Sequence, residues 1–264
     1  MVAGVASAPF QDPIVHLLFW QLVFNPFQEA CPPGWIRSGL HPGCSRPATY
    51  RTIQLRKPAF AALFDGWPTQ REPLGVVFVI APWNYPYLTA VNAIMPAILA
   101  GNSVVLKHSA QTPLCSERFH QAFQAAGLPE GVFQYLHLSH KDTEDIVRDE
   151  RVDYVAFTGS VSGGAMVEHA AAGRFIGVGL ELGGKDPAYV RSDADISHAV
   201  EITMDGAFFN SGQSCCGIER IYVHESVYDA HLQQAITWVK KLKLGRPDAQ
   251  DTTLGPLVRT SAAD

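Results

Sequence analysis

The sequence predicts an α/β fold built on a doubly wound parallel sheet. From about residue 70 onward, short apolar runs rich in β-branched residues alternate with segments of helical spacing. Strands that alternate with helices of roughly 10–15 residues form βαβ units, whose strands lie parallel in one sheet. Because each crossover is right-handed, helices are expected on both faces of that sheet.

The first elements carry clear start and stop signals. The run LGVVFVIAP at 74–82 is apolar and ends in proline, as expected of a buried strand. The helix expected at 87–100 stops at Gly101-Asn102, and the helix expected at 112–127 begins with Thr-Pro and stops at a glycine. The other expected strands are 103–108, 132–138, 152–159, 175–184, 186–190 and 218–223. The other expected helices are 141–148, 161–173, 195–209 and 226–243.

The first part of the chain lacks this periodicity. The composition changes near 65–69, and we expect residues 1–66 to form an irregular segment with a short helix at 57–64. The apolar run at 14–24 is shorter than the about 20 residues that a membrane-spanning helix needs. It also lacks the basic flank and the small-residue cleavage site of a signal peptide, so we expect it to be buried within protein.

The composition limits the class of function. The chain has 264 residues, is 47% hydrophobic and carries a formal net charge of −5, so it can bury a sizeable core. It has no basic block, so neither nucleic acid nor a membrane surface is expected as a partner. The five cysteines show no CxxC spacing and the histidines show no ligand spacing. We therefore expect no metal site and a reducing, cytoplasmic location.

Polar residues and glycines recur where the expected strands end. APWNYP follows the first strand, Lys107 lies at the end of the second, and TGSVSGG and ELGGK follow later ones. Ligands of doubly wound sheets bind at the carboxyl ends of the strands. The glycines of TGSVSGG and the free N–H groups of the next helix suit a dinucleotide pyrophosphate, although Gly and Ser also start helices for structural reasons. The common G-x-G-x-x-G fingerprint is absent.

Three side chains near these ends could carry chemistry, and each has a structural alternative. Glu181 could act as a general base if burial raised its pKa, or it could pair with Lys185. The Asn84 amide, held in a turn between prolines, could stabilise an oxyanion or cap its own turn. Cys215, which follows SGQS, could be an activated nucleophile or a buried structural thiol.

Several motifs, taken together and in this order, resemble those of the aldehyde dehydrogenase superfamily. They are VIAPWNYP, GNSVVLKHS, VAFTGSVSGG, LELGGKDP, FFNSGQSCCGIERIYV and TTLGPLV, and they cover about 70–264. In the family's F-x-x-x-G-Q-x-C pattern the nucleophile is the second residue after the Gln, which here is Cys215 after Gln213. The resemblance also implies Glu181 as the general base and Asn84 as the oxyanion donor.

This resemblance implies an oxidoreductase that converts an aldehyde to a carboxylic acid with NAD, or with NADP, as cofactor. Cys215 would attack the carbonyl, hydride transfer would leave a thioester, and Glu181 would activate the water that hydrolyses it. In the family's K-P-S-E motif the Glu grips the ribose; the motif reads KHSA here, so Ala110 stands in its place and NADP stays open. The residues expected to contact the cofactor are Ile80, Ala81, Pro82, Trp83, Lys107, Gly159, Ser160, Gly164 and Leu182.

By the same resemblance, residues 67–182 form a Rossmann-like dinucleotide-binding domain and residues 183–264 form the start of a second α/β catalytic domain. Family subunits are homo-oligomeric and usually much longer, and this chain ends before the family's E-x-F-G-P motif and its oligomerisation strand. A shortened member of the family is therefore expected. Two alternatives stay open: a catalytically impaired fragment that binds nucleotide or partner subunits, and a cysteine-dependent esterase.

Overall fold

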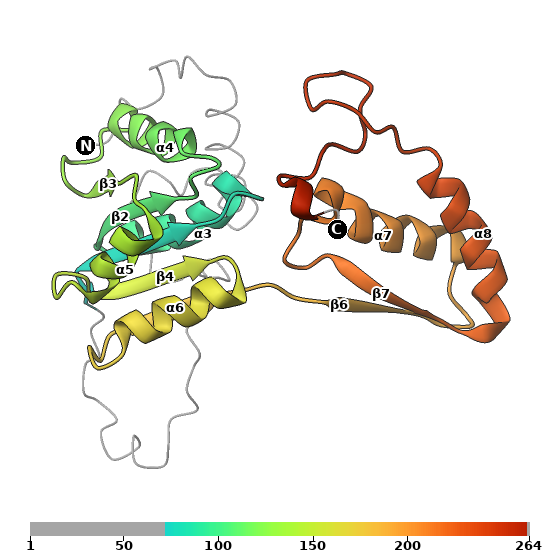
Figure 1. Cartoon of the computed structure of the whole chain (residues 1–264), viewed down its shortest axis with the longest axis horizontal. Helices are drawn as coiled ribbons and strands as arrows, with labels where there is room; N and C mark the ends of the chain where they lie inside the picture. The colour runs from blue at the N-terminus through green and yellow to red at the C-terminus, as the bar shows by residue number, and fades with distance from the viewer. Residues whose placement is uncertain (1–71, 263–264) are drawn as a thin grey trace, which may run out of the picture.

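The structure is a computed structural model that describes residues 72–262. The segments expected at 1–66, 14–24 and 57–64 lie outside the described residues. The described part contains a five-stranded parallel sheet in the order β3-β2-β1-β4-β5 and a two-stranded parallel sheet of β6 and β7 (Figure 1). This arrangement confirms the expected α/β class with a parallel sheet.

The boundaries of most elements agree with the expectations to within a few residues. The strands are β1 (Val76–Ala81), β2 (Ser103–His108), β3 (Phe133–Tyr135), β4 (Tyr154–Thr158), β5 (Gly177–Glu181), β6 (Asp186–Val190) and β7 (Ile218–Val223). The α-helices are α3 (Pro86–Leu99), α4 (Leu114–Ala125), α5 (His140–Arg148), α6 (Val161–Ala171), α7 (Ile196–Phe208) and α8 (Tyr228–Val239). Short 3-10 turns lie at Phe209–Gly212, Glu225–Val227 and Thr260–Ala262. No helix among residues 72–262 is long and apolar enough to cross a membrane.

Three expected elements are shorter than predicted. The strand expected at 132–138 keeps only β3, because a Ser139–Asp142 capping box starts α5 immediately afterwards. The strand expected at 175–184 begins later because Phe175 has a φ of 59°, and it ends at Glu181, which pairs with the last residue of β4. The helix expected at 226–243 gives way at its start to the 3-10 turn Glu225–Val227 and ends at Val239.

Strand β1 runs through the middle of the larger sheet and is buried on both faces. Val77 and Val79 belong to a core with residues of α3 and α4, whereas Phe78 and Ile80 belong to a second core with residues of α5 and α6. A strand covered on both faces needs an unbroken apolar run, which explains VVFVIA. Loss of the fully buried ring in Phe78→Ala would cost about 3–5 kcal/mol.

The strand order places a topological switch point between β1 and β4. The chain proceeds outward from β1 to β2 and β3, then returns to β4 on the other side of β1. The connections on the two sides of β1 and β4 run over opposite faces, and a crevice forms at the carboxyl ends of these strands. Within this edge of the sheet, Ile80 has Lys107 as its neighbour on β2 and Phe157 as its neighbour on β4.

The smaller sheet has a helical layer on one face only. Helices α7 and α8 pack on it through a core of Val200, Met204 and Ala235, which also contacts Ile221 of β7. On the other face, Tyr189 and Tyr222 are register neighbours and both are exposed. The smaller sheet and its two helices stand beside the larger sheet and are reached through residues 182–185 (Figure 1). The domain division at 182/183 stays a prediction.

Candidate active site

The carboxyl edge of the larger sheet holds the residues expected to contact a dinucleotide. Ile80 and Ala81 end β1 and are buried, and Pro82 and Trp83 follow in the turn to α3. Lys107 lies near the end of β2, and Gly159 and Ser160 connect β4 to α6. Gly164 lies in the first turns of α6 and Leu182 directly after β5. The fold therefore brings these nine residues to one edge.

The start of α6 has the features of an anion-binding helix terminus. The Ser160 side chain accepts a hydrogen bond from Gly163 N–H at 3.1 Å, and the Ser160 carbonyl accepts one from Gly164 N–H. Neither bond uses the N–H groups of Val161 and Ser162, which have no acceptor among the described residues. Free N–H groups at a helix N-terminus favour a phosphate. The donor set of this chain thus fits a dinucleotide pyrophosphate.

Tight packing explains the glycines of this helix start. A Cβ built on Gly159 or Gly163 would lie 2.7 Å or 2.6 Å from the Phe157 ring. A Cβ on Gly164 would lie 2.7 Å from Leu182 Cδ2. The bare backbone lets α6 approach both Phe157 and the segment after β5.

Lys107 is a buried ammonium group that has no counter-ion in the described part of the chain. Its side chain is 7% exposed and makes no hydrogen bond or ion pair with residues 72–262. Burial lowers the pKa of Lys107 below the ordinary range. A buried donor at the carboxyl end of a central strand suits the hydroxyl groups of a bound ribose. The exposed Ala110 nearby supplies no carboxylate for the same group.

A second group of contacts joins the β1–α3 turn to the segment that carries Cys215. Asn84 Nδ2 donates a hydrogen bond of 2.9 Å to the carbonyl oxygen of Gln213. Asn210 Nδ2 donates in return to the carbonyl oxygen of Asn84 at 3.0 Å. The Tyr85 and Ser214 hydroxyl groups are also hydrogen-bonded, and the Tyr85 ring stacks on Phe209. Asn84 therefore lies beside the cysteine segment, although 129 residues separate it from Gln213.

The segment before Cys215 has an unusual backbone. Asn210, Ser211 and Gly212 have φ values of 51°, 59° and 73°. Left-handed residues in succession reverse the chain at the end of α7, and two of the three are non-glycine residues, which carry a conformational cost. Two side-chain hydrogen bonds to the C-terminal segment stabilise this backbone and offset the cost. Ser211 Oγ donates to the Gly255 carbonyl at 2.8 Å, and Gln213 Oε1 accepts from Val258 N–H at 2.8 Å.

Cys215 and Cys216 occupy the centre of a turn that a bond from Gly217 N–H to the Ser214 carbonyl closes at 3.2 Å. Both cysteines are exposed, which contradicts the alternative of a buried structural thiol. Partial burial of the sulfur, followed by the charge and hydrogen bond of Cys216, raises the pKa of the Cys215 thiol. The N–H groups of Cys215 and Cys216 act in the opposite direction. The thiol is therefore not activated by its surroundings alone.

Glu181 lies exposed at the end of β5, and its side chain makes no hydrogen bond or ion pair within residues 72–262. The alternative of a Glu181–Lys185 pair is wrong, because Lys185 Nζ contacts both carboxylate oxygens of Glu219, at 2.6 Å and 2.7 Å. The segment after Glu181 reaches the cysteine turn, since a Cβ on Gly184 would lie 2.7 Å from the Cys215 carbonyl oxygen. Glu181 is therefore unpaired within the described residues, and the segment that follows it reaches the cysteine turn through Gly184.

Sequence reasoning did not identify Tyr85, Asn210 and Ser214, which hold the site together. Each stands inside a motif already singled out, NYP or NSGQSCC. Asn210 carried a usable signal, because Asn followed by Ser-Gly favours a left-handed turn. The sequence carries no signal for the pairing of Tyr85 with Ser214, since a hydroxyl contact between distant segments leaves no periodic pattern.

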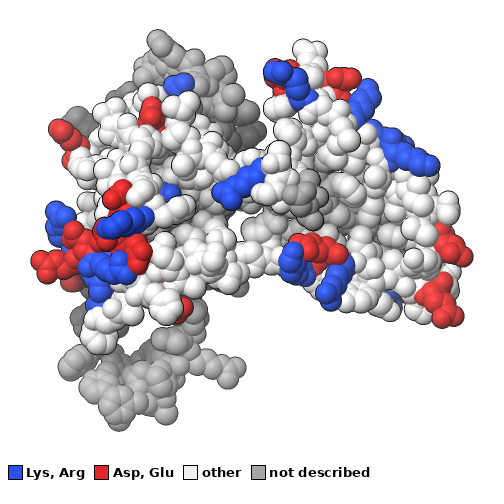
Figure 2. Space-filling model, in the orientation of Figure 1, with Lys and Arg blue, Asp and Glu red and all other residues white. Residues whose placement is uncertain are grey.

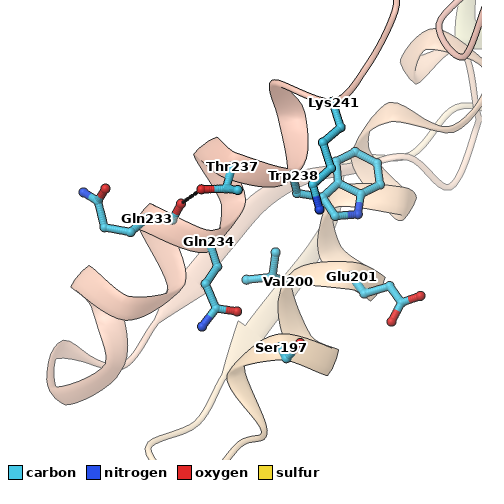
Figure 3. A pocket seen from close by; sticks show the side chains of 8 residues that line it. All are labelled: Ser197, Val200, Glu201, Gln233, Gln234, Thr237, Trp238 and Lys241. Atoms are coloured by element: carbon cyan, nitrogen blue, oxygen red, sulfur yellow. Dashed lines mark hydrogen bonds between the residues drawn. The ribbon is translucent and has the colours of Figure 1, made fainter.

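The described surface also has a hollow in the part of the chain that carries the smaller sheet. Ser197, Val200, Glu201, Gln233, Gln234, Thr237, Trp238 and Lys241 line a pocket of about 450 Å³ between α7 and α8 (Figure 3). It contains none of the expected site residues. Figure 2 shows Lys and Arg side chains interspersed with Asp and Glu on the face drawn, with wide uncharged areas between them.

Comparison with known proteins points to the same family as the motifs do. The model of the aldehyde dehydrogenase family matches residues 65–264. A probable succinate-semialdehyde dehydrogenase [NADP(+)] of Synechocystis sp. is 38% identical over 186 residues, which are 70% of this chain and 41% of that protein. A D-glyceraldehyde dehydrogenase (NADP(+)) of Picrophilus torridus is 38% identical over 195 residues, or 74% of this chain and 39% of that protein.

Solved structures show the same relationship. The crystal structure of succinate-semialdehyde dehydrogenase from Burkholderia pseudomallei superposes with a TM-score of 0.70 at 33% identity, covering 74% of this chain and 43% of that one. The chain thus spans about two fifths of the length of the relatives it matches. Because the family model covers most of the chain and the motifs, fold and structural matches agree, the chain belongs to the aldehyde dehydrogenase family.

Proposed function

We propose that the chain takes part in the NAD(P)-dependent oxidation of an aldehyde to a carboxylic acid, with Cys215 as the nucleophile. The observation that carries this proposal is the hydrogen bond from Asn84 to the Gln213 carbonyl. This bond ties the β1–α3 turn, at the carboxyl edge of the larger sheet, to the segment that bears the thiol. Residues 67–182 would bind the nucleotide, and residues 183–264 would supply the cysteine.

The geometry supports a role for Asn84 in holding an oxyanion. A side-chain amide has two N–H donors. Gln213 takes one of them at 2.9 Å, which fixes the plane of the amide and leaves the second N–H available. When the Cys215 sulfur attacks an aldehyde carbonyl, negative charge develops on its oxygen. A fixed amide donor placed beside this oxygen stabilises the charge without reorganisation.

The thiol has to lose its proton before it attacks, because its pKa is raised. Glu181 is the carboxylate on the segment that leads to Gly184 and the cysteine turn, and no group within residues 72–262 engages it. We assign to it the removal of the Cys215 proton and, later, of a proton from the water that hydrolyses the thioester. A nicotinamide bound at the sheet edge would accept the hydride of the aldehyde.

The relatives guide the choice of substrate and nucleotide. The names of three relatives specify succinate semialdehyde, and all three also specify NADP(+) or NAD(P)+. We propose a small aldehyde that carries a carboxylate as the first substrate to test. We also propose that NADP is accepted along with NAD, because Ala110 places no carboxylate where a 2′-phosphate would be repelled.

The test measures reduced nicotinamide produced by the purified chain with succinate semialdehyde and NAD or NADP. Aldehyde-dependent turnover that Cys215→Ala abolishes and Glu181→Gln lowers by about 10²–10⁴-fold would support the proposal. Nucleotide-induced thermal stabilisation without turnover would instead favour an impaired, nucleotide-binding chain. Cleavage of p-nitrophenyl acetate that needs Cys215 but no nucleotide would favour the esterase alternative.

A further inference from the structure

The pocket between α7 and α8 is lined by two opposite charges that do not pair with each other. Glu201 lies on α7, and Lys241 follows the end of α8. Among the lining residues the one hydrogen bond drawn in Figure 3 joins Thr237 to Gln233, and neither charged side chain has an ion pair within residues 72–262. Both charged groups are therefore available to a ligand.

The pocket has a packed, apolar floor. Val200 is buried in the core that joins α7 to α8, and Trp238 packs against that core. The Trp238 ring also contacts Phe208, with 6.2 Å between the ring centroids. Because these contacts hold the indole in place, a ligand that lies on it needs little ordering of the protein, which favours binding.

Trp238 and Lys241 provide two donors from one helical turn. The Lys241 N–H donates to the Trp238 carbonyl at 3.0 Å, so the turn continues past the last residue of α8 and keeps the two side chains adjacent. The Trp238 indole N–H has no acceptor within the described residues. In the view of Figure 3 the nitrogen atoms of both side chains are directed toward α7. Two neighbouring donors suit a carboxylate, which accepts on both oxygens.

The charges of the lining select against simple ions. Glu201 would repel a carboxylate that carries no positive group, and Lys241 would repel a simple amine. A ligand that carries both charges satisfies both side chains. The other polar lining side chains are neutral amides or hydroxyls, from Ser197, Gln233, Gln234 and Thr237. The volume of about 450 Å³ lies in the range of small-molecule sites.

We propose that the α7–α8 pocket binds a free α-amino acid with an apolar side chain. Its carboxylate accepts hydrogen bonds from Lys241 Nζ and the Trp238 indole N–H, and its ammonium group donates to Glu201. Its side chain lies on Trp238 and Val200. The pocket contains none of the residues assigned to aldehyde oxidation, so this binding is independent of the proposed function. Because both charged partners are exposed, the affinity is modest.

The experiment is a saturation-transfer difference NMR titration of the full chain with L-leucine as the probe. Two analogues each lack one charge: 4-methylpentanoate has no ammonium group, and 3-methylbutylamine has no carboxylate. We expect leucine to bind at least about 10-fold more tightly than either analogue, because each loses a hydrogen bond between charged groups. Absence of saturable leucine binding, or equal binding of either analogue, would overturn the proposal.

Substitutions at the two charges locate the binding. Glu201→Gln and Lys241→Gln change exposed side chains and should each weaken leucine binding by about 10-fold. Glu201→Gln should also bind 4-methylpentanoate as well as leucine, and Lys241→Gln should bind 3-methylbutylamine as well as leucine. Lys240→Gln is the matched control, because it removes the same charge one residue away and outside the pocket.

The control should bind leucine as the wild-type chain does. Unchanged leucine affinity in either pocket variant would assign the binding to another place and refute the site. An equal loss in Lys240→Gln would do the same, because the effect would then come from the overall charge of the chain.

Discussion

The Asn84 side chain donates a 2.9 Å hydrogen bond to the Gln213 main-chain carbonyl, two residues before Cys215. Asn84 belongs to the turn after β1, the central strand of the larger sheet, whereas Gln213 lies between α7 and β7 in the part of the chain that forms the smaller sheet. This amide is one of several contacts that link the carboxyl end of the larger sheet to the cysteine turn. Because Asn84 is half-buried, its position is set by packing as well as by this bond.

Replacement of this amide should affect catalysis more than folding. If Asn84 holds the oxyanion, Asn84→Ala should lower kcat by about 10²–10³-fold with little change in KM. Asn210→Gly is the matched control, because it removes another donor to the same turn and glycine tolerates the φ of 51° found there. We expect this control to lose much less activity in steady-state assays. Equal losses in the two variants would show that Asn84 acts only by holding the turn.

The buried ammonium of Lys107 should cost stability in exchange for nucleotide binding. It lies buried without an ion pair in the described part of the chain, and burial disfavours its charged form. Lys107→Met keeps the length of the side chain and removes the charge. We expect the midpoint of thermal unfolding to stay the same or rise, while the stabilisation produced by NAD or NADP disappears. An undiminished nucleotide shift in differential scanning fluorimetry would refute the assigned role.

Cys216 should suppress the reactivity of its neighbour. After burial, its charge and hydrogen bond are the next influences that raise the pKa of Cys215. Cys216→Ala removes both, so the pKa of Cys215 should fall and a larger fraction should be thiolate at neutral pH. Alkylation of Cys215 by iodoacetamide, followed by peptide mapping, should become faster at pH 7.5, with its pH midpoint moved downward. Cys115→Ala should leave the midpoint unchanged; an upward move in Cys216→Ala would contradict the prediction.

The two glycines after Glu181 and Leu182 should tolerate substitution differently. A Cβ on Gly184 would lie 2.7 Å from the backbone oxygen of Cys215, which cannot move without moving the turn. A Cβ on Gly183 meets nothing within 4 Å. We therefore expect Gly184→Ala to destabilise the chain by about 1–3 kcal/mol in urea unfolding and to change the alkylation rate of Cys215. Gly183→Ala should do neither, and comparable effects would argue against the close approach.

His108 should make stability depend on pH. Burial, together with the charge of Lys107, lowers the pKa of His108 below its ordinary value, although a hydrogen bond to the Pro86 carbonyl opposes this. The folded chain then binds a proton less readily than the unfolded chain. The stability due to neutral His108 is fully present above pH of about 6.5 and is lost as pH falls through the lower, folded pKa.

Urea unfolding between pH 8 and pH 5.5 checks this dependence. His108→Gln should flatten the loss of stability at low pH and, by removing buried hydrogen bonds, cost about 1–3 kcal/mol at pH 8. Thr112→Val is the control, since it removes the hydroxyl partner of Nδ1 and keeps the imidazole. The same slope in His108→Gln and in the wild-type chain would show that another group is responsible.

Much of the larger sheet could be predicted because its signals are local. The apolar run of β1, the Ser160 start of α6 and the glycine after α4 each lie within a few residues of the element they define. The same locality explains the errors. A capping box at Ser139 shortened β3, and a left-handed Phe175 delayed β5. When strand boundaries are predicted from the sequence alone, neither feature outweighs the apolar run that predicts a longer strand.

The sequence by itself determined the order of strands and helices along the chain and which residues stand at the strand ends, among them Glu181 and Lys107. Periodicity and turn chemistry act between neighbours, so the chain records them directly. Only the tertiary structure decided that Asn84 meets Gln213, that Lys185 pairs with Glu219 and not with Glu181, and that Lys107 is buried with no counter-ion within residues 72–262. These outcomes depend on the packing of segments far apart in the chain, where distance and desolvation set both the hydrogen-bond partner and the pKa.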